Sequence, residues 1–214
     1  MLHILNQQAS VANSFLAELR DKSVQQDRER FRINIERLGE MMAYEISKKL
    51  EYTEMKIETP LGTASVSLIR QEPVLITVLR AGLPYFCGFQ RYFTRADCGF
   101  IGAARKENGE EISIALDYLA APNVDGRPVI LVDPMLATGK SFVKSVHTLK
   151  NHGKPSHIHV ASLVAAPEGV AYIKEKLKPP HTIWTWALDE KLNARSYIVP
   201  GLGDAGDLCY GEKL

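Results

Sequence analysis

A short segment, residues 129–142, combines an acid, hydroxyl side chains and a glycine in a pattern suited to binding an anion. Four apolar residues, 129–132, predict a buried strand that ends at Asp133. A loop of small residues follows, and a helical pattern begins at Ser141. Backbone N–H groups of such a loop and of the first helical turn point toward one place. The segment therefore predicts a strand-loop-helix cradle for a phosphate group.

The end of this loop also matches part of the nucleoside-triphosphatase P-loop, G-x-x-x-x-G-K-[ST], through Gly139, Lys140 and Ser141. The first glycine of that motif falls on Pro134, which has no backbone N–H. This mismatch argues against a triphosphatase. An ordinary turn of an α/β domain explains the strand and the helix, but not an acid followed by Thr138 and Gly139. Thr138 supplies a hydroxyl donor, and Gly139 lets the backbone approach a ligand closely.

Two other apolar runs end in a cation. Residues 73–79 stop at Arg80, and residues 98–104 stop at Arg105. A charged side chain at the end of a buried strand is costly unless it has a partner. Ligands of parallel α/β sheets bind at the carboxyl ends of the strands, so an anion is the expected partner. The alternative for Arg80 is a bond to carbonyl groups or to a carboxylate of the protein.

The glycine-rich tail, Tyr197 to Asp207, contains too many glycines for a helix or a plain strand, so a shaped loop is expected. Backbone N–H and C=O groups of such a loop can match the carbonyl and N–H groups of a small planar amide. The alternative is a surface connection without a ligand.

The remaining patterns predict an α/β domain around these segments. The first fifty residues have helical periodicity, and residues 55–68 alternate about a Pro60–Gly62 turn as a hairpin does. A second hairpin is expected around Asn108-Gly109. Helices are expected over residues 83–92, 141–151 and 168–177, and strands over residues 158–164 and 182–188.

Composition narrows the class of protein. The chain has 214 residues, 45% hydrophobic residues and a formal net charge of +1, which fits one large domain without a general attraction to nucleic acid or to an anionic membrane. Three scattered cysteines indicate neither a disulfide framework nor a zinc site. The sequence shows no signal peptide and no membrane-spanning run, so a cytoplasmic location is expected.

Three further features have two interpretations each. Arg20 is expected on the surface, with a phosphate of a neighbouring site as the alternative. Trp184 and Trp186 are expected to pack in the core or at a subunit contact rather than to stack on a base. His157 and His159 lie two residues apart where a strand begins, so they share a face and could bind a metal with His152. They lie at the end of the sheet opposite the anion site, which argues against that role.

The loop from Asp133 to Gly139, DPMLATG, resembles the 5-phosphoribosyl 1-pyrophosphate (PRPP) loop of type I phosphoribosyltransferases, and its Asp-Pro pair is typical of the uracil enzymes. Strings that resemble the same family are spread in family order from about residue 16 to residue 211. They are LRDK at 19–22, ETPLG at 58–62, VLRAG at 78–82, VAAPEG at 164–169 and the glycine-rich tail. Two residues depart from the family pattern, Lys140 in place of a glycine and Ala120 in place of a lysine.

The resemblance implies the type I phosphoribosyltransferase fold, a central, mainly parallel sheet flanked by helices, with a mobile hairpin over residues 106–122. It implies a small base-binding hood, with the base-binding loop over residues 197–211 and with residues 1–70 contributing to the hood or to subunit contacts. The implied reaction converts uracil and PRPP to UMP and pyrophosphate. Mg²⁺ is the implied cofactor, bound mainly through PRPP. A homo-oligomer and a possible GTP effector are implied as well.

The resemblance also assigns roles to residues. The implied catalytic residues are Asp133, Arg105 and Asp204. The implied PRPP-binding residues are Arg80, Arg105, Asp133, Pro134, Met135, Leu136, Ala137, Thr138, Gly139, Lys140, Ser141 and Asp204. The implied uracil-binding residues are Ile198, Gly203, Asp204 and Ala205.

Two other functions remain as alternatives. Some proteins of this fold bind RNA and regulate pyrimidine genes, although the near-neutral charge argues against a nucleic-acid partner here. A transferase for another base would differ in the loop 198–205. Asp204 is the nearest candidate for a general base, and no other residue stands out for that role.

Overall fold

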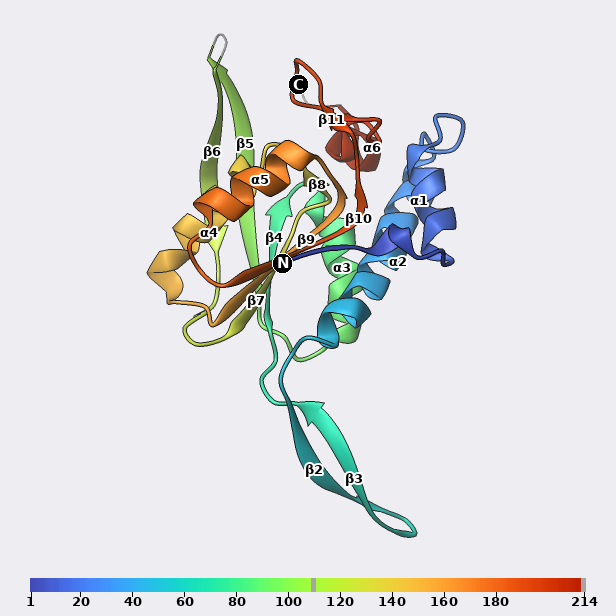
Figure 1. The fold of residues 1–214 in the computed structure, drawn as a ribbon, viewed down its shortest axis with the longest axis vertical. Helices are drawn as coiled ribbons and strands as arrows, with labels where there is room; N and C mark the ends of the chain where they lie inside the picture. The colour runs from blue at the N-terminus through green and yellow to red at the C-terminus, as the bar shows by residue number, and fades with distance from the viewer. Residues whose placement is uncertain (109–110, 213–214) are drawn as a thin grey trace.

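A sheet with helices on both faces forms the middle of the molecule (Figure 1). The structure is a computed structural model that describes residues 1–108 and 111–212, and for residues 103–108 and 111–117 it describes the backbone alone. Within the described chain the main sheet has eight strands in the order β1-β10-β9-β7-β4-β5-β6, with β8 paired to β9. Every pair is parallel except β5 with β6. The predicted α/β class with a mainly parallel sheet is confirmed.

The strands of this sheet follow the apolar runs of the sequence closely. Their bounds are β1 Leu2–Ile4, β4 Val74–Leu79, β5 Cys98–Asn108, β6 Glu111–Ala120, β7 Pro128–Val132, β8 Met135–Leu136, β9 His157–Ala165 and β10 His181–Leu188. The central strands β4, β7 and β9 are almost wholly buried, as expected for parallel strands covered on both faces.

The helices divide between the two faces of the sheet. They are α1 Ala12–Arg20, α2 Arg28–Ser47, α3 Gly82–Tyr92, α4 Lys140–Leu149, α5 Pro167–Lys176 and α6 Ala205–Tyr210, with short 3₁₀ turns η1 Leu5–Gln7 and η2 Lys150–His152. Side chains alternate along each strand, so Leu75 packs with α1–α3 while Val74 and Ile76 pack with α4 and α5. The fold is a three-layer α/β sandwich (Figure 1).

Helix α2 buries the predicted apolar stripe, which consists of Phe31, Ile35, Leu38, Met42 and Ile46. The Asp27 carboxylate caps the helix by accepting the N–H of Arg30 at 3.0 Å. The indole of Trp186 donates to the Leu38 carbonyl at 3.1 Å, so α2 is tied to β10. Both tryptophans are buried. Their predicted packing role is therefore confirmed over base stacking.

Two expectations about secondary structure were wrong. Residues 2–4, expected within a helical region, form β1, whose His3 lies opposite Trp184 in parallel register. Three residues are too few to show a period, so only the edge of β10 defines this strand. The tail is not a loop throughout, because residues 205–210 form α6. The Asp204 carboxylate caps this helix by accepting the N–H groups of Gly206 and Asp207, which compensates for its glycine.

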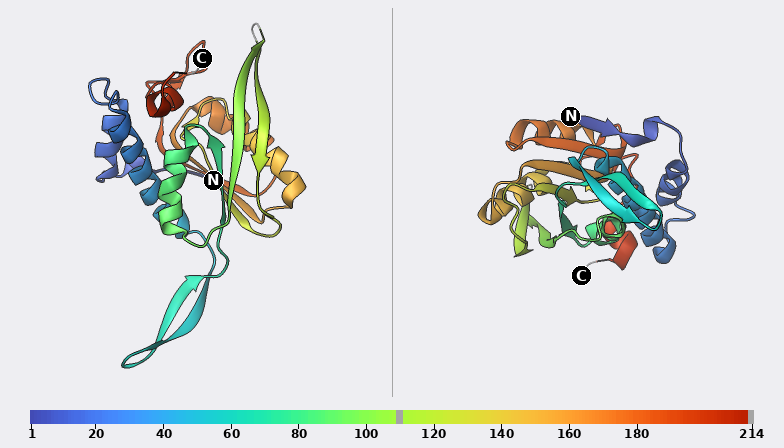
Figure 2. Two further views of the ribbon diagram at one scale, coloured as in Figure 1. Left: turned by 180° about the vertical axis from the view of Figure 1, so that it is seen from behind. Right: turned by 90° about the horizontal axis from the view of Figure 1, so that it is seen from below.

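The predicted hairpin at residues 55–68 is confirmed as a two-stranded arm, β2 Tyr52–Thr59 and β3 Gly62–Ile69. Figure 2 shows it extending well away from the body of the molecule. Met55 and Ile57 lie opposite Val66 and Ala64, so these side chains share one face of the arm. All but Ala64 are exposed. The arm therefore presents an apolar face that nothing in its own chain covers among the described residues.

The hairpin of β5 and β6 is also confirmed, with antiparallel pairing out to Asn108 and Glu111 and a register shift between Gly102 and Ala103. Its predicted Asn-Gly turn includes Gly109, which lies outside the described residues. Two short strands, β11 Lys191–Leu192 and β12 Ile198–Val199, form a small antiparallel sheet before α6. Among the described residues, no helix combines the length and the apolar character needed to cross a membrane.

Candidate active site

A cavity of about 190 Å³ lies at the carboxyl ends of β4 and β7, under the glycine-rich tail. Its walls come from three segments far apart in the sequence, which are residues 78–81, 133–142 and 196–206. Parallel strands end on the same edge of a sheet, so their loops converge there. The structure thus brings together the anion loop, Arg80 and the tail, the three features that the sequence singled out.

The anion loop has the geometry expected of a phosphate cradle. Asp133 follows β7, and its Oδ1 accepts the N–H of Met135 at 3.2 Å. Gly139 has a φ of 74° and precedes the first turn of α4. A Cβ atom at Gly139 would lie 2.8 Å from the carbonyl oxygen of Gly169, so only glycine fits. The first residues of α4 line the cavity beside Gly139, and the N–H groups of a first helical turn have no acceptor within the helix.

Lys140 is the first residue of α4 and has a helical backbone. Among the described residues other than glycine, only Ser196 has a positive φ. A lysine is therefore accommodated where the family has a glycine, and its side chain is exposed. The hydroxyl of Thr138 accepts the N–H of Lys140 at 3.4 Å.

Most of the predicted PRPP-binding segment lines the cavity, namely Asp133, Met135, Ala137, Thr138, Gly139, Lys140 and Ser141. Pro134 and Leu136 do not. The Pro134 carbonyl accepts the N–H groups of Leu163 and Val164, and Leu136 is buried in the core beneath the loop. These two residues support the loop rather than face the cavity.

Arg80 lies at the rim of the cavity and is held by the protein itself. Its Nη2 lies 3.1 Å from Oδ1 of Asp207, and its Nη1 lies 3.4 Å from the carbonyl oxygen of Gly211. Its Nε is buried without a partner in the structure. The alternative interpretation, a bridge to a carboxylate, is therefore present beside the predicted position at the anion site. No motif or spacing in the sequence identifies Asp207 as that carboxylate.

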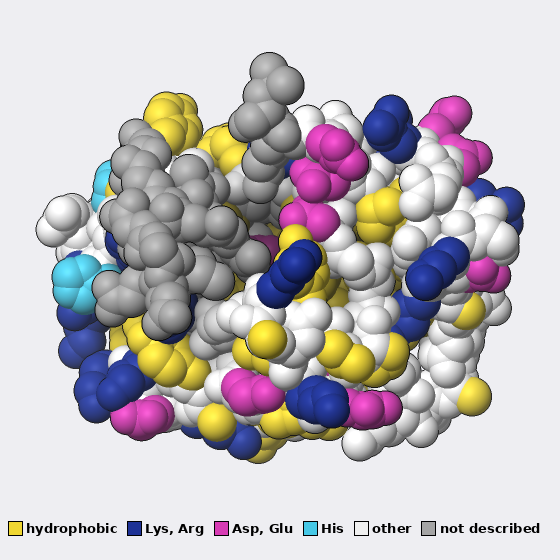
Figure 3. Space-filling model, turned by 90° about the horizontal axis from the view of Figure 1, so that it is seen from above, with side chains coloured by type: hydrophobic (Ala, Val, Ile, Leu, Met, Phe, Trp, Pro, Cys, Tyr) yellow, Lys and Arg dark blue, Asp and Glu magenta, His cyan; other side chains and the backbone are white. Residues whose placement is uncertain are grey.

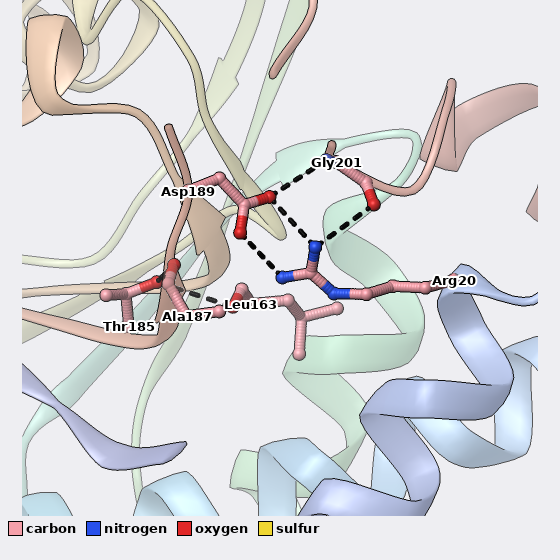
Figure 4. A network of polar contacts seen from close by, with 6 residues as sticks. All are labelled: Arg20, Leu163, Thr185, Ala187, Asp189 and Gly201. Atoms are coloured by element: carbon pink, nitrogen blue, oxygen red, sulfur yellow. Dashed lines mark hydrogen bonds and ion pairs between the residues drawn. The ribbon is translucent and has the colours of Figure 1, made fainter. Parts of the chain in front are cut away.

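The tail is anchored at its other end by Arg20 (Figure 4). Both guanidinium Nη atoms bind the carboxylate of Asp189 at 2.8 and 3.0 Å, and Nη1 also donates to the Gly201 carbonyl at 3.3 Å. Asp189 in turn accepts the N–H of Gly201 at 2.9 Å. The Asp189 side chain is only 6% exposed. The expectation that Arg20 is a free surface residue is wrong, because its guanidinium binds Asp189 and the tail carbonyl of Gly201.

The four predicted base-contacting residues, Ile198, Gly203, Asp204 and Ala205, all line the cavity. Tyr197 and Gly206, which belong to the predicted base-binding loop but were not named as contacts, lie beside them, as does Ser196, which precedes that loop. The side chain of Arg105 lies outside the described residues, and only its place in β5, opposite Ile114, is known. Figure 3 looks onto this end of the molecule and shows side chains of both charges on it.

The amino end of the sheet holds a cluster of histidines. His3 stacks on Trp184 with ring centroids 4.2 Å apart, and the Trp184 indole donates to Nδ1 of His159 at 3.1 Å. Burial lowers the pKa of His159 to about 3, and burial likewise lowers the pKa values of His3 and His157. These histidines are neutral at pH 7. A hollow of about 870 Å³ adjoins them, but no group of three or more metal-binding side chains occurs among the described residues.

Comparison with known proteins agrees with this arrangement. Residues 6–212 match the model of the family described as uracil phosphoribosyltransferase. The chain is 46% identical over 211 residues to the uracil phosphoribosyltransferase of Porphyromonas gingivalis, covering 98% of each chain. It is 38% identical over 202 residues to the enzyme of that name from Pyrococcus furiosus, covering 93% of this chain and 85% of the relative.

Among solved structures, the AQ2163 protein of Aquifex aeolicus superimposes with a TM-score of 0.87 at 31% identity, over 99% of this chain and 98% of that one. The match extends over the arm, the sheet and the tail alike, since almost no residue of either chain is left out. The family that the motifs suggested is confirmed. The chain belongs to the uracil phosphoribosyltransferase family.

Proposed function

We propose that this protein transfers the phosphoribosyl group of PRPP to uracil, giving UMP and pyrophosphate, at the cavity on the carboxyl edge of the sheet. The observation that carries this proposal is the convergence of the anion loop, Arg80 and the tail on that one cavity. A substrate with a phosphate, a sugar and a pyrophosphate, together with a planar base, needs such adjacent subsites.

Each subsite has a role for residues of this chain. The N–H groups of residues 136–141 and the Thr138 hydroxyl bind the 5′-phosphate. The Asp133 carboxylate accepts hydrogen bonds from the ribose hydroxyls. Arg80 and Arg105 stabilise the negative charge that develops on the departing pyrophosphate while the sugar gains oxocarbenium character. Catalysis then rests mainly on positioning and electrostatics.

The base binds under the tail. Ile198 contacts the ring, and Gly203 and Ala205 present backbone groups to the uracil carbonyl and N–H groups. Asp204 lies between base and PRPP, with Oδ1 held by the N–H groups of Gly206 and Asp207 at 2.8 and 3.0 Å. These two bonds fix its orientation. Asp204 is the candidate to bind PRPP and to accept the N1 proton, because it lines the cavity between the two subsites.

Mg²⁺ suits the oxygen donors of this cavity. Asp133 and Asp204 line it, and hard oxygen ligands are those that Mg²⁺ prefers. Because the described residues contain no cluster of three or more metal ligands, the ion would be held mainly by the oxygens of PRPP. When bound, it neutralises charge on the pyrophosphate. The β5–β6 hairpin is the proposed mobile cover that excludes water from the reacting sugar.

The decisive experiment supplies PRPP and Mg²⁺ with uracil, hypoxanthine or orotate in separate reactions and measures pyrophosphate. Release with uracil alone is the expected result, and removal of Mg²⁺ with EDTA is expected to stop it. Release of pyrophosphate with hypoxanthine or orotate but not with uracil would overturn the assignment of uracil as the substrate. Thr138→Val is expected to raise the KM for PRPP more than the KM for uracil.

We infer further that the protein is a cytoplasmic homo-oligomer in which a second copy covers the apolar face of the arm. An isolated two-stranded hairpin is only marginally stable, and here its apolar face includes exposed Met55, Ile57, Val66 and Leu68. Met55→Glu is expected to lower the molar mass measured by light scattering. Glu54→Gln on the opposite face is the matched control. GTP is a candidate effector, and the test is the rate of UMP formation with and without it.

A further inference from the structure

Arg80 is the one predicted pyrophosphate ligand whose side chain the structure describes, and its surroundings show what holds it. Its guanidinium lies against the first turn of α6, where a Cβ atom at Gly206 would approach Nη2 to 3.6 Å. On that side it meets the carboxylate of Asp207 at 3.1 Å and, at longer range, the carbonyl of Gly211. Both charged side chains are about one third exposed, 38% for Arg80 and 34% for Asp207.

Asp207 does not line the cavity, whereas Arg80 does. A carboxylate behind an arginine restricts the rotamers of a long side chain that otherwise moves freely in solvent. The guanidinium has five N–H donors, and Asp207 takes one of them at good distance. The Nε donor is buried and has no partner in the structure. The arginine is thus held in place with donor capacity left for an anion.

Helix α6 holds the Asp207 side of this contact in a fixed position. Its first turn is capped by Asp204, which binds the N–H of Asp207 at 3.0 Å. Its far end is tied to α2, because the Arg32 guanidinium donates to the Cys209 carbonyl at 2.8 Å. Asp207 therefore stands on a short helix that is anchored at both ends, and it can hold Arg80 in one position.

We propose that Asp207 is a positioning residue that keeps the Arg80 guanidinium at the rim of the cavity, ready to bind the pyrophosphate of PRPP. The inference rests on the proposed function, because it takes PRPP as the ligand. Asp207 acts before the reaction, on the binding of PRPP, and not on the binding of uracil. The opposite interpretation, that Asp207 competes with pyrophosphate for Arg80, predicts effects of the opposite sign.

The test compares Asp207→Asn with the parent protein by titrating PRPP and Mg²⁺ in a calorimeter. Loss of the carboxylate is expected to weaken PRPP binding about fivefold, the upper range for a partly exposed ion pair. Asp207→Glu is expected to recover much of the loss. The matched control is Asp97→Asn, which removes the partner of Arg127 at the amino end of the sheet and is expected to leave PRPP binding unchanged. Tighter PRPP binding in Asp207→Asn would overturn the proposal in favour of competition.

A double-mutant cycle separates positioning from simple stabilisation of α6. If Asp207 acts through Arg80, then Arg80→Met with Asp207→Asn binds PRPP no more weakly than Arg80→Met alone. Additive losses, or an equal rise in the KM for uracil, would instead show that Asp207 only supports the tail, and the proposal would fall. Absence of PRPP binding by the parent protein would overturn it as well. PRPP binding without turnover of uracil would refute the proposed function and leave the Asp207 comparison valid.

Discussion

The two ends of the parallel sheet are both hollowed, yet they carry polar groups of different kinds. At the carboxyl end, Arg80, Asp133 and Asp204 line a cavity together with the first residues of α4. At the amino end, His3 and His159 lie against Trp184 and are neutral at pH 7 because burial lowers their pKa values. The larger hollow is at the amino end. Volume therefore does not identify the site, and charge alone does not either, because Lys49, Glu51 and Arg70 line the amino-end hollow. The convergence of loops and a helix start at the carboxyl ends of the strands does.

This difference leads to a general expectation. Substitutions of cavity residues at the carboxyl end should change activity more than stability, because those groups are arranged for a ligand. Substitutions of residues that already satisfy one another should change stability more than activity. The four substitutions below separate residues that act on activity from residues that act on stability.

The largest effect is expected for Asp133→Asn. The substitution keeps the shape of the side chain but removes the negative charge of the carboxylate that accepts hydrogen bonds from the ribose hydroxyls. The value of kcat/KM should therefore fall about a hundredfold. The free energy of unfolding should change little, because asparagine Oδ1 can still accept the N–H of Met135. Steady-state kinetics and urea denaturation together test this. Unchanged kcat/KM would remove Asp133 from the catalytic residues.

Asp189→Asn is expected to act on stability although it too lies near the carboxyl end. Arg20 would lose its bidentate partner and Gly201 a charged acceptor, which should lower the free energy of unfolding by about 2–3 kcal/mol. Urea denaturation measures the change. Glu51→Gln, which breaks the exposed pair with Arg70, is the control and should cost less than about 1 kcal/mol. Equal losses of unfolding free energy in the two variants would contradict the distinction between the partly buried Arg20–Asp189 pair and an exposed pair.

The buried histidine His159 at the amino end of the sheet should make the free energy of unfolding depend on pH. Burial lowers the pKa of His159 to about 3 from 6.5, so between these values the unfolded state binds a proton that the folded state does not. Stability is therefore fully present above pH 6.5 and is lost as the pH falls. The loss at pH 5 should be about 2 kcal/mol from this group. In His159→Gln, urea denaturation at pH 7 and pH 5 should show a smaller difference, while kcat at pH 7 stays close to that of the parent. An unchanged difference would mean that His159 is not the responsible group.

The smallest effect is expected for Lys140→Gly, which restores the family residue. The backbone N–H, which donates to the Thr138 hydroxyl, is kept. Activity should therefore stay within about twofold of the parent, and the helix should lose less than about 1 kcal/mol. Initial rates at subsaturating PRPP are the sensitive measurement. Complete loss of activity would show that the lysine ammonium itself binds the phosphate.

Much of the architecture could be predicted because it is local. Buried strands such as β7 and β9 appear as apolar runs, and α2 shows its period over five turns. The tail was predicted less well. Its glycines argued for a loop, but Asp204 caps a helix there, and one side-chain cap decides the start of so short a helix. Strand β1 was missed because three residues carry no period and depend on the edge of β10.

The anion cradle follows from local sequence alone, since the strand, the glycine and the helix start that build it are neighbours in the chain and their backbone geometry follows from local rules. The carboxylate that each arginine meets depends instead on how distant segments pack. Arg20 pairs with Asp189 across 169 residues and Arg80 with Asp207 across 127. Such pairs depend on the packing of α1, β4 and the tail around one sheet, and no spacing in the sequence encodes them. The same packing assigns Arg20 to the support of the tail and leaves Arg80 at the cavity.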